Sequence, residues 1–445
     1  MKLLVPPLKI SETDGFRADI DIFNRKAYGE SLFNIINNTD DELVIALNAP
    51  WGEGKSTFIK MWRGFLSEKQ VPNVYFDAFE NDYQQDPLLA ISSQLYGLID
   101  KKQSKAQAEF KQKTLSALKV IGRAGLRVGI KALTAGVLDE TVLIQTDNVE
   151  DASDEASDLV DNFIMQQLTK SEENRKSLVA FKDYLSTLGK KLGGGKNLVF
   201  IIDELDRCKP KFALAILESI KHLFSVPHIT FVLVMNRTQL EEAVRCEYGS
   251  GVDAARYLQK FVSIWATLPK ANQQHITSGN SYVCNCLKAM NFEVKTQAHR
   301  SAIENFEELV NYFDLSLREI EKSLTNFAII YNATDEANLN SDYLLLATFI
   351  CIIKVIEPGI YQKLFHKKMD YEELLNTAGL GKLNARYWDE EESHPLRWLL
   401  KYYLSSEDVA SELITSLKDK RMFRLSSNRE SLANICSWLE TFKRT

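Results

Sequence analysis

The sequence predicts an α/β protein with a parallel-sheet core that carries a phosphate-binding loop, a helical insertion within that core, and an all-helical C-terminal lid and domain. Three observations predict this class. A glycine-rich loop at residues 49–56 stands between a strand pattern and a helix pattern, and a second apolar run ends in acids at residues 197–208. The apolar run at residues 343–356 has the length of a buried helix and is too short to span a membrane.

The loop at residues 49–56 reads Ala-Pro-Trp-Gly-Glu-Gly-Lys-Ser and fits the pattern [AG]-x-x-x-x-G-K-[ST]. Residues 43–47 before it are apolar, as in a buried parallel strand. Residues 57–65 after it have apolar side chains at 58, 59, 62 and 65, which is the spacing of a helix. A phosphate-binding loop requires this order of strand, loop and helix.

This loop has the chemistry to hold the phosphates of a nucleotide. Backbone N–H groups at a helix N-terminus converge on an anion, and the helix dipole favours negative charge there. Gly52 and Gly54 let the backbone approach the ligand, Lys55 would reach the β- and γ-phosphates, and the Ser56 hydroxyl would contact Mg²⁺. The predicted nucleotide-binding residues are Gly52, Glu53, Gly54, Lys55, Ser56 and Thr57.

The second element is an apolar strand that runs into a cluster of acids at residues 203–208, which we call the acidic box. A carboxylate at the C-terminal end of a central parallel strand lies where open α/β sheets bind ligands. Asp203 would hold Mg²⁺, and Glu204 would polarise the attacking water as a general base. Asp206 and Arg207 could form a local ion pair, or they could take part in the site. Arg207 could alternatively act on the site of a neighbouring subunit.

A third strand is predicted at residues 229–235, and Asn236 follows it. In ring and switch ATPases such a strand ends in a polar residue that contacts the γ-phosphate or the catalytic water, so Asn236 is the candidate sensor. The alternative is an ordinary cap of the helix that begins near Thr238.

Together these residues resemble the KAP family of P-loop NTPases, within the additional-strand, catalytic-glutamate class. The resemblance covers residues 20–370 and rests on the loop and the acidic box, as its Walker A and Walker B motifs, and on residues 74–80 and 257–269. It implies a bacterial, soluble ATPase that binds ATP and Mg²⁺ between core and lid. Residues 316–322 are similar to the lid motif of the family, which implies a sensor role for Arg318.

The predicted domains follow from these landmarks. Residues 1–95 and 190–270 would form the P-loop NTPase core, residues 96–189 a helical insertion, residues 271–370 the helical lid, and residues 371–445 a C-terminal helical region.

The insertion is where many members of the family carry transmembrane helices. Here the apolar stretch at residues 117–138 is interrupted by Arg123, Arg127 and Lys131, and each cation near the bilayer centre costs about 3 kcal/mol. We therefore expect no transmembrane segment. The three cations share one helix face, which could meet an anionic membrane surface, nucleic acid, an acidic partner, the acidic run at residues 147–161, or solvent alone.

Composition limits the alternatives. The net charge of -6 argues against a surface that coats nucleic acid. The N-terminus has no signal-peptide pattern, and the six cysteines are scattered, so we expect reduced thiols and a cytoplasmic protein. The cysteines and histidines lack the spacing of a zinc site.

The predicted function is a regulatory or motor ATPase of the KAP type that acts with other protein subunits and as a homo-oligomer. In bacteria the family is associated with phage exclusion, which suggests a multi-protein antiviral defence complex. Two alternatives remain: a nucleotide-gated oligomeric scaffold with little turnover, and an ATP-dependent protein that engages nucleic acid through the basic face.

Overall fold

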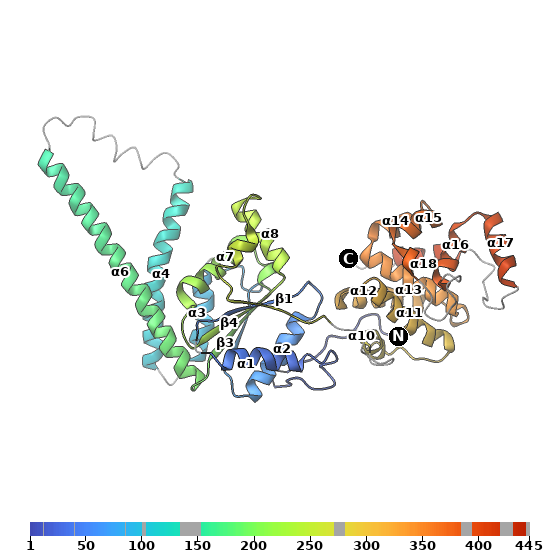
Figure 1. Cartoon of the computed structure of the whole chain (residues 1–445), viewed down its shortest axis with the longest axis horizontal. Helices are drawn as coiled ribbons and strands as arrows, with labels where there is room; N and C mark the ends of the chain where they lie inside the picture. Colours follow the sequence, from blue (N-terminus) through green and yellow to red (C-terminus); the bar gives the residue numbers. More distant parts are fainter. Residues whose placement is uncertain are drawn as a thin grey trace. The chain divides into compact units, whose positions relative to one another are not determined.

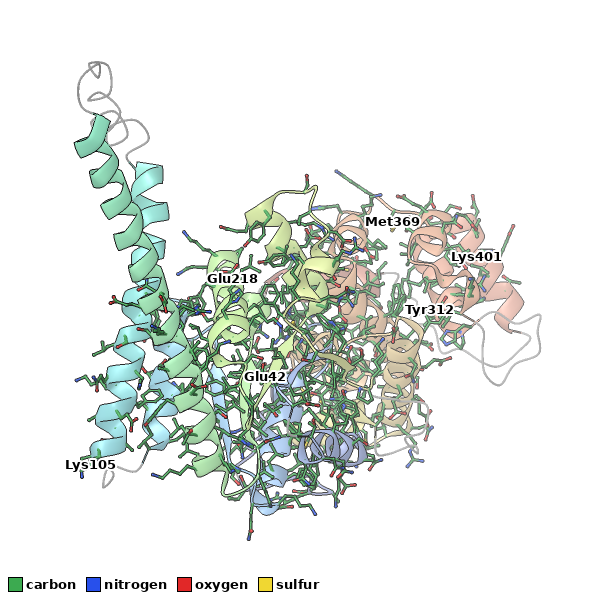
Figure 2. All side chains as sticks on the ribbon, turned by 60° about the vertical axis from the view of Figure 1, so that its left-hand side comes forward. Glu42, Lys105, Glu218, Tyr312, Met369 and Lys401 are labelled. Carbon is green, nitrogen blue, oxygen red and sulfur yellow. The ribbon has the colours of Figure 1, made fainter. Side chains whose placement is uncertain are left out.

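A computed structural model describes residues 1–11, 13–39, 41–84, 86–99, 104–133, 153–270, 281–383, 394–418 and 430–441, without the side chains of 119, 121–133, 153–171 and 416–418. The chain forms two compact units. The α/β unit consists of Ile10–Pro50 and Lys55–Pro269, and the helical unit of Met1–Lys9, Trp51–Gly54 and Lys270–Thr445. In Figure 2, Glu42 and Glu218 mark the α/β unit, and Tyr312, Met369 and Lys401 mark the helical unit.

The α/β unit is built on a five-stranded sheet in the order β2-β3-β4-β1-β5, and all of its pairs are parallel. The strands are β1 (Val44–Asn48), β2 (Asn73–Asp77), β3 (Leu198–Asp203), β4 (Ile229–Met235) and β5 (Ile264–Thr267). The last residues of β2 and β3, Asp77 and Asp203, are register partners, so the carboxyl ends of the strands lie at one edge. The predicted fold class is confirmed.

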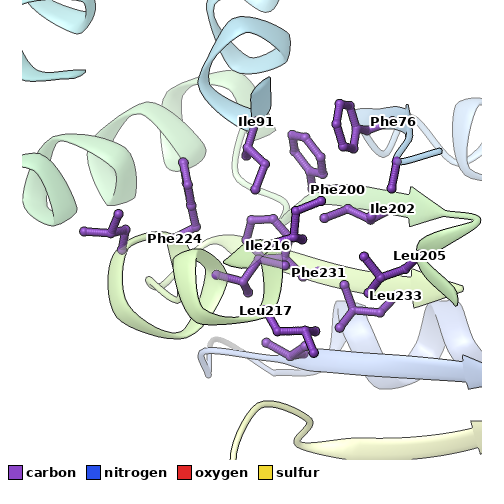
Figure 3. Close-up of a cluster of buried hydrophobic side chains, with 14 of the residues drawn as sticks. Phe76, Ile91, Phe200, Ile202, Leu205, Ile216, Leu217, Phe224, Phe231 and Leu233 are labelled. Carbon is purple, nitrogen blue, oxygen red and sulfur yellow. The ribbon is translucent and has the colours of Figure 1, made fainter. Parts of the chain in front are cut away.

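Both faces of the sheet are buried, which explains the continuous apolar runs of its central strands. Every residue of β3 and β4 is buried. Successive side chains alternate between the faces: Phe200 and Phe231 pack in one cluster (Figure 3), and Val199 and Val232 pack in the other. Helices α3 (Pro87–Leu98), α6 (Ser153–Gly193), α7 (Pro210–Ser219), α8 (Arg237–Tyr248) and α9 (Ala254–Leu258) contribute to the first cluster, and α1 (Lys26–Asn37) and α2 (Lys55–Glu68) to the second.

The insertion consists chiefly of two long helices, α4 (Ser104–Leu133) and α6, which lie side by side and extend beyond the sheet (Figure 1). Buried Phe110 of α4 and Phe181 of α6 anchor the pair on the core, where the Phe181 ring meets Phe224 edge-on at 5.8 Å. Among the helices of the described ranges, none is at once long and apolar enough to cross a bilayer. The basic face at 123, 127 and 131, and the acidic run at residues 147–161, lie outside the described side chains.

The helical unit has α13 (Ser341–Ile356) at its centre. Residues 344–353 of this helix are all buried, which explains the uninterrupted apolar run in the sequence. Around it lie α10 (Tyr282–Ala289), α11 (Gln297–Tyr312), α12 (Leu317–Ala333), α14 (Pro358–Phe365), α15 (Tyr371–Thr377), α16 (Pro395–Leu404), α17 (Glu407–Lys418) and α18 (Ser431–Thr441).

Candidate functional site

The loop at residues 49–56 joins the end of β1 to the start of α2. Gly52 and Gly54 have φ angles of 89° and 76°, which are left-handed values that glycine adopts without strain. The backbone of the loop therefore needs the two glycines of the motif. Within the helical unit, a Cβ atom on Gly52 would lie 2.9 Å from Ser316 Oγ, so a side chain at this position is excluded by space as well.

Lys55 begins α2, and its side chain is buried beneath the loop. Its ammonium group donates to the carbonyl oxygens of Ala49 at 2.7 Å and Pro50 at 3.1 Å. Burial lowers the pKa of Lys55, and the nearby carboxylates of the acidic box act in the opposite direction. The only positive charge of the loop is thus buried beside acids, at the point where the motif places phosphates.

Asp203 ends β3 and is completely buried. One carboxylate oxygen accepts from the backbone N–H of Glu204 at 2.8 Å, and the other accepts from the Tyr75 hydroxyl at 3.1 Å. Burial raises the pKa of Asp203, and hydrogen bonds from Ser56, Glu204 and Tyr75 act against that rise. A cation at this carboxylate would relieve the cost of burying it.

Glu204 follows with a φ of 59°, a left-handed conformation that costs a residue with a side chain about 1 kcal/mol or more. Its carboxylate accepts from the Ser56 hydroxyl at 3.2 Å and forms an ion pair with Arg207. Burial, and then the charge of Asp203, raise the pKa of Glu204, whereas Arg207 and Ser56 lower it. The fold thus joins the loop to the acidic box, although the two residues are 148 positions apart.

Arg207 therefore forms the local ion pair that the sequence left open as one alternative. It belongs to a short 3-10 helix, Leu205–Arg207, which turns its guanidinium back onto Glu204. Asp206 lies close enough to Lys55 to raise the pKa of that lysine.

Asn236 follows β4 at the same edge of the sheet, because Met235 is the register partner of Asn48. Its side-chain oxygen accepts from the Thr238 N–H at 3.2 Å and caps the N-terminus of α8. The capping role, one of the two predicted alternatives, is thus present.

The remaining predicted residues lie in both units. Thr57 is in the first turn of α2, and Glu53 is buried in the loop. Arg318 lies in the first turn of α12, whose N-terminus has a capping box formed by Ser316 and Glu319. Within the helical unit, the Cβ atom of Arg318 lies 2.9 Å from the position of a Cβ on Gly52.

The oxygen atoms of Ser56 and Asp203 are suitable ligands for the Mg²⁺ ion that accompanies a bound nucleotide. In the part of the chain with described side chains, no three His, Cys, Asp or Glu residues are grouped to hold a metal ion. Mg²⁺ commonly keeps several waters and takes one or two protein ligands beside substrate phosphates. Asp203 and the hydroxyl of Ser56 would supply those protein ligands.

Tyr75 is a site residue that the motifs did not identify. Its hydroxyl donates to Asp203 across 128 positions of sequence, and its ring lies 5.2 Å from the Arg63 guanidinium. A tyrosine within an apolar strand is an ordinary half-buried residue, so its role arises only from the pairing of β2 with β3.

Comparisons with known proteins agree with the motifs. The model of the KAP family P-loop domain matches residues 25–334, which is more than half of the chain. No curated protein matches the sequence. The ORC2 protein of Aeropyrum pernix in its ADP form is 13% identical, with 97% of this chain and 95% of that chain covered at a TM-score of 0.34. Its ADPNP-ADP complexes give 13% identity, coverage of 98% and 97%, and a TM-score of 0.35. At such low TM-scores, the likeness to ORC2 supports no statement about function.

Proposed function

Because this chain belongs to the KAP family of P-loop domains, we propose that it binds ATP together with Mg²⁺ and hydrolyses it. The observation that carries the proposal is the meeting of Ser56 with Glu204 at 3.2 Å, beside the buried carboxylate of Asp203. A metal-binding hydroxyl, a metal-binding carboxylate and a base are groups that serve triphosphate hydrolysis in P-loop enzymes.

Each group has one task in this proposal. Lys55 would exchange its bonds to the Ala49 and Pro50 carbonyls for charge-assisted bonds to phosphate oxygens. Glu204 would accept the proton of the attacking water, for which its raised pKa brings it nearer to neutral pH. A bound Mg²⁺ would neutralise charge on the phosphate oxygens, with Ser56 and Asp203 as its protein ligands. Asn236 and Arg318 are the proposed sensors.

The order of the sheet supports the assignment to the additional-strand, catalytic-glutamate class. Strand β4 lies between β1, which leads into the loop, and β3, which leads into the acidic box. In the proposed arrangement Glu204 would hold a water molecule between itself and the phosphates, which favours hydrolysis over storage of the nucleotide.

The purified full chain provides the direct test. We expect Mg²⁺-dependent release of phosphate from ATP, and a decrease of at least about 100-fold when EDTA removes the metal. Binding of ATP without any turnover would contradict the proposed hydrolysis, and absence of binding would contradict the whole proposal. Parallel reactions with GTP would show whether the protein prefers adenine or guanine nucleotides.

Removal of Arg207 is expected to change the pH dependence of hydrolysis. Only ionised Glu204 can accept a proton, so activity is lost as the pH falls through the pKa of Glu204. Arg207 lowers that pKa, and in Arg207→Ala the pKa rises, so the acidic limb should move to higher pH. Hydrolysis rates of both proteins, measured from pH 5 to 8, locate the acidic limb of each profile.

The matched control is Arg245→Ala, which removes an arginine that pairs with Glu241 and Glu242 on α8. Its acidic limb should coincide with that of the wild type. If the limb also stays in place in Arg207→Ala, Glu204 is not the group that titrates.

We further propose that the protein acts in the cytoplasm as a homo-oligomer, with other subunits of a complex that serves antiviral defence in bacteria. Aromatic side chains after β2 support an interface close to the site: Phe79 is 49% exposed and Tyr83 is 73% exposed. Asp82, which lies between these two aromatic residues in the sequence, accepts at 3.3 Å from the N–H of Lys209, the residue that follows the acidic box. Sedimentation with and without ATP tests this part, and a monomer in both conditions contradicts it.

The nucleotide-gated scaffold remains the second candidate. The Glu204 carboxylate accepts a hydrogen bond from Ser56 and forms an ion pair with Arg207, and a carboxylate held in this way is less available to a water molecule. In that case ATP would bind and change the oligomeric state, with no phosphate released.

A further inference from the structure

The helical unit contains a polar cavity of about 460 Å³ that the proposed ATPase chemistry does not use. Four segments line it: the end of α12, the turn into α13 with the first turn of that helix, α16, and one face of α18. The volume is in the range of small-molecule sites. Nearly all of its lining side chains carry a hydroxyl, an amide or a carboxylate, and Trp438 supplies an aromatic wall.

Asp342 is the unusual residue of this cavity. It is half-buried in the first turn of α13, and in the described part of the chain its carboxylate has neither a hydrogen bond nor an ion pair. Burial is the only cause that raises its pKa, to about 6. A carboxylate removed from water without a donor is unfavourable, so a bound group that restores the lost interactions would bind with a gain in free energy.

The charge of the cavity selects the kind of ligand. Asp335 and Asp342 both line it, and no lysine or arginine of the described chain does. Phosphates and other anions are therefore repelled, whereas a cation is attracted by two carboxylates. The amides of Asn338 and Asn434 add hydrogen-bonding groups at the rim. Trp438, 36% exposed, also lines the cavity, and an indole ring is the aromatic group that attracts cations most strongly.

The wall formed by α18 is held firmly in place. Lys354 of α13 donates to the Leu439 carbonyl at 2.6 Å, near the C-terminus of α18, and Tyr361 donates to the Cys436 carbonyl at 3.2 Å. On its opposite side α18 buries Leu432, Ile435 and Leu439. The polar face of this helix is thus fixed toward the cavity.

We propose that this cavity binds a small organic cation, whose ammonium, amidinium or guanidinium group contacts Asp342 and Asp335 while its body lies against Trp438. The site is separate from the nucleotide chemistry, and the proposal stands whether or not the chain hydrolyses ATP. The ligand would be recognised by its positive charge and its size.

The test uses benzamidine, a planar cation, and benzamide, its neutral counterpart of nearly the same shape. Saturation-transfer NMR on the full chain should detect benzamidine binding with a Kd on the order of 1 mM. Benzamide should bind at least about 10-fold more weakly, because it lacks the charge. Asp342→Asn should weaken benzamidine binding by about 10-fold or more, and Trp438→Ala should weaken it by a smaller factor.

Asp408→Asn is the matched control. Asp408 is also the second residue of a helix, α17, but it is exposed, so this variant removes the same interaction with a helix N-terminus and should leave benzamidine binding unchanged. Melting temperatures identify unfolded variants. Asp342→Asn should melt close to the wild type, because the lost interaction with the helix N-terminus is offset by removal of a half-buried charge that has no ion pair.

The pH dependence gives a second readout. The titratable groups facing Asp342 are Asp335 and Tyr343 beside it and Tyr403 of α16, and α18 contributes none to the lining. Burial raises the pKa of both tyrosines, so they stay neutral, and benzamidine stays protonated. Binding should therefore strengthen from pH 5 to 7, as Asp342 ionises. Equal binding to Asp342→Asn, equal binding of benzamide, or no binding at about 10 mM benzamidine would each overturn the proposal.

Discussion

Replacement of Glu204 by glutamine is expected to lower steady-state ATP hydrolysis by about 100-fold or more and to leave ATP binding nearly intact. A general base contributes roughly 10²- to 10⁴-fold to a rate, and the amide of glutamine cannot accept a proton at neutral pH. Glutamine keeps the size of the side chain and can still accept from the Ser56 hydroxyl, which now bonds to Glu204 at 3.2 Å. The loss should therefore appear in kcat, with little change in KM.

The strained backbone of Glu204 makes this variant informative. Its φ of 59° holds the carboxylate between Ser56 and Arg207, and glutamine keeps the same backbone and the same length. Folding should therefore be unaffected, and the melting temperature should stay close to that of the wild type. A decrease in hydrolysis without a decrease in melting temperature would assign the effect to chemistry.

Glu247→Gln on α8 is the control, because this glutamate is exposed and its side chain forms no hydrogen bond or ion pair with the described residues. Its hydrolysis rate should equal that of the wild type. If Glu204→Gln hydrolyses ATP as fast as the wild type does, the proposed base is wrong. If neither protein hydrolyses ATP although both bind it, the nucleotide-gated scaffold is the better description.

Replacement of Lys55 by methionine is expected to weaken ATP binding by about 100-fold or more. Hydrogen bonds to charged groups contribute about 1.5 to 3 kcal/mol each, and Lys55 would make two of them to the β- and γ-phosphates. Methionine fills a similar volume without charge. Titration with a fluorescent ATP analogue measures the affinity, and phosphate release should fall in parallel.

Folding should survive this change. Lys55 is a buried cation whose pKa is lowered by burial, so replacing it with an apolar group removes a desolvated charge. The bonds to the Ala49 and Pro50 carbonyls are lost, which offsets that gain. The free energy of unfolding in the absence of nucleotide should therefore change by no more than about 1 kcal/mol.

Lys60→Met is the matched control, because Lys60 lies on the exposed face of the same helix. It tests whether loss of one positive charge from α2 weakens binding through the general field of the protein. If Lys60→Met and Lys55→Met weaken ATP binding equally, or if neither does, the loop does not hold the phosphates in the proposed way.

The local features of this chain could be predicted because each depends on neighbouring residues. The run at residues 43–47 is apolar throughout, and the run at residues 229–235 is apolar except for Thr230, as is typical of strands buried on both faces. The glycines at positions 52 and 54 supply the left-handed backbone of the loop. Asn236 illustrates the limit, because a polar residue after a strand fits both a sensor and a helix cap, and the bond to Thr238 N–H became visible only in the structure.

The features that could not be predicted depend on contacts between residues far apart in the chain. The order of the sheet places β4 between β1 and β3, which no local pattern indicates. The polar cavity could not be predicted from the sequence, because its lining residues are spread between positions 333 and 441. Each of its polar side chains, taken singly, resembles an ordinary surface residue.

The amino-acid sequence was therefore sufficient to identify the loop, the acidic box and the family, because phosphate binding and strand burial constrain consecutive residues. The bond from Tyr75 to Asp203, the hold of Ser56 and Arg207 on Glu204, and the unpartnered Asp342 depend on the fold. Register, burial and the direction of side chains set these contacts, and they exist only once distant segments pack together.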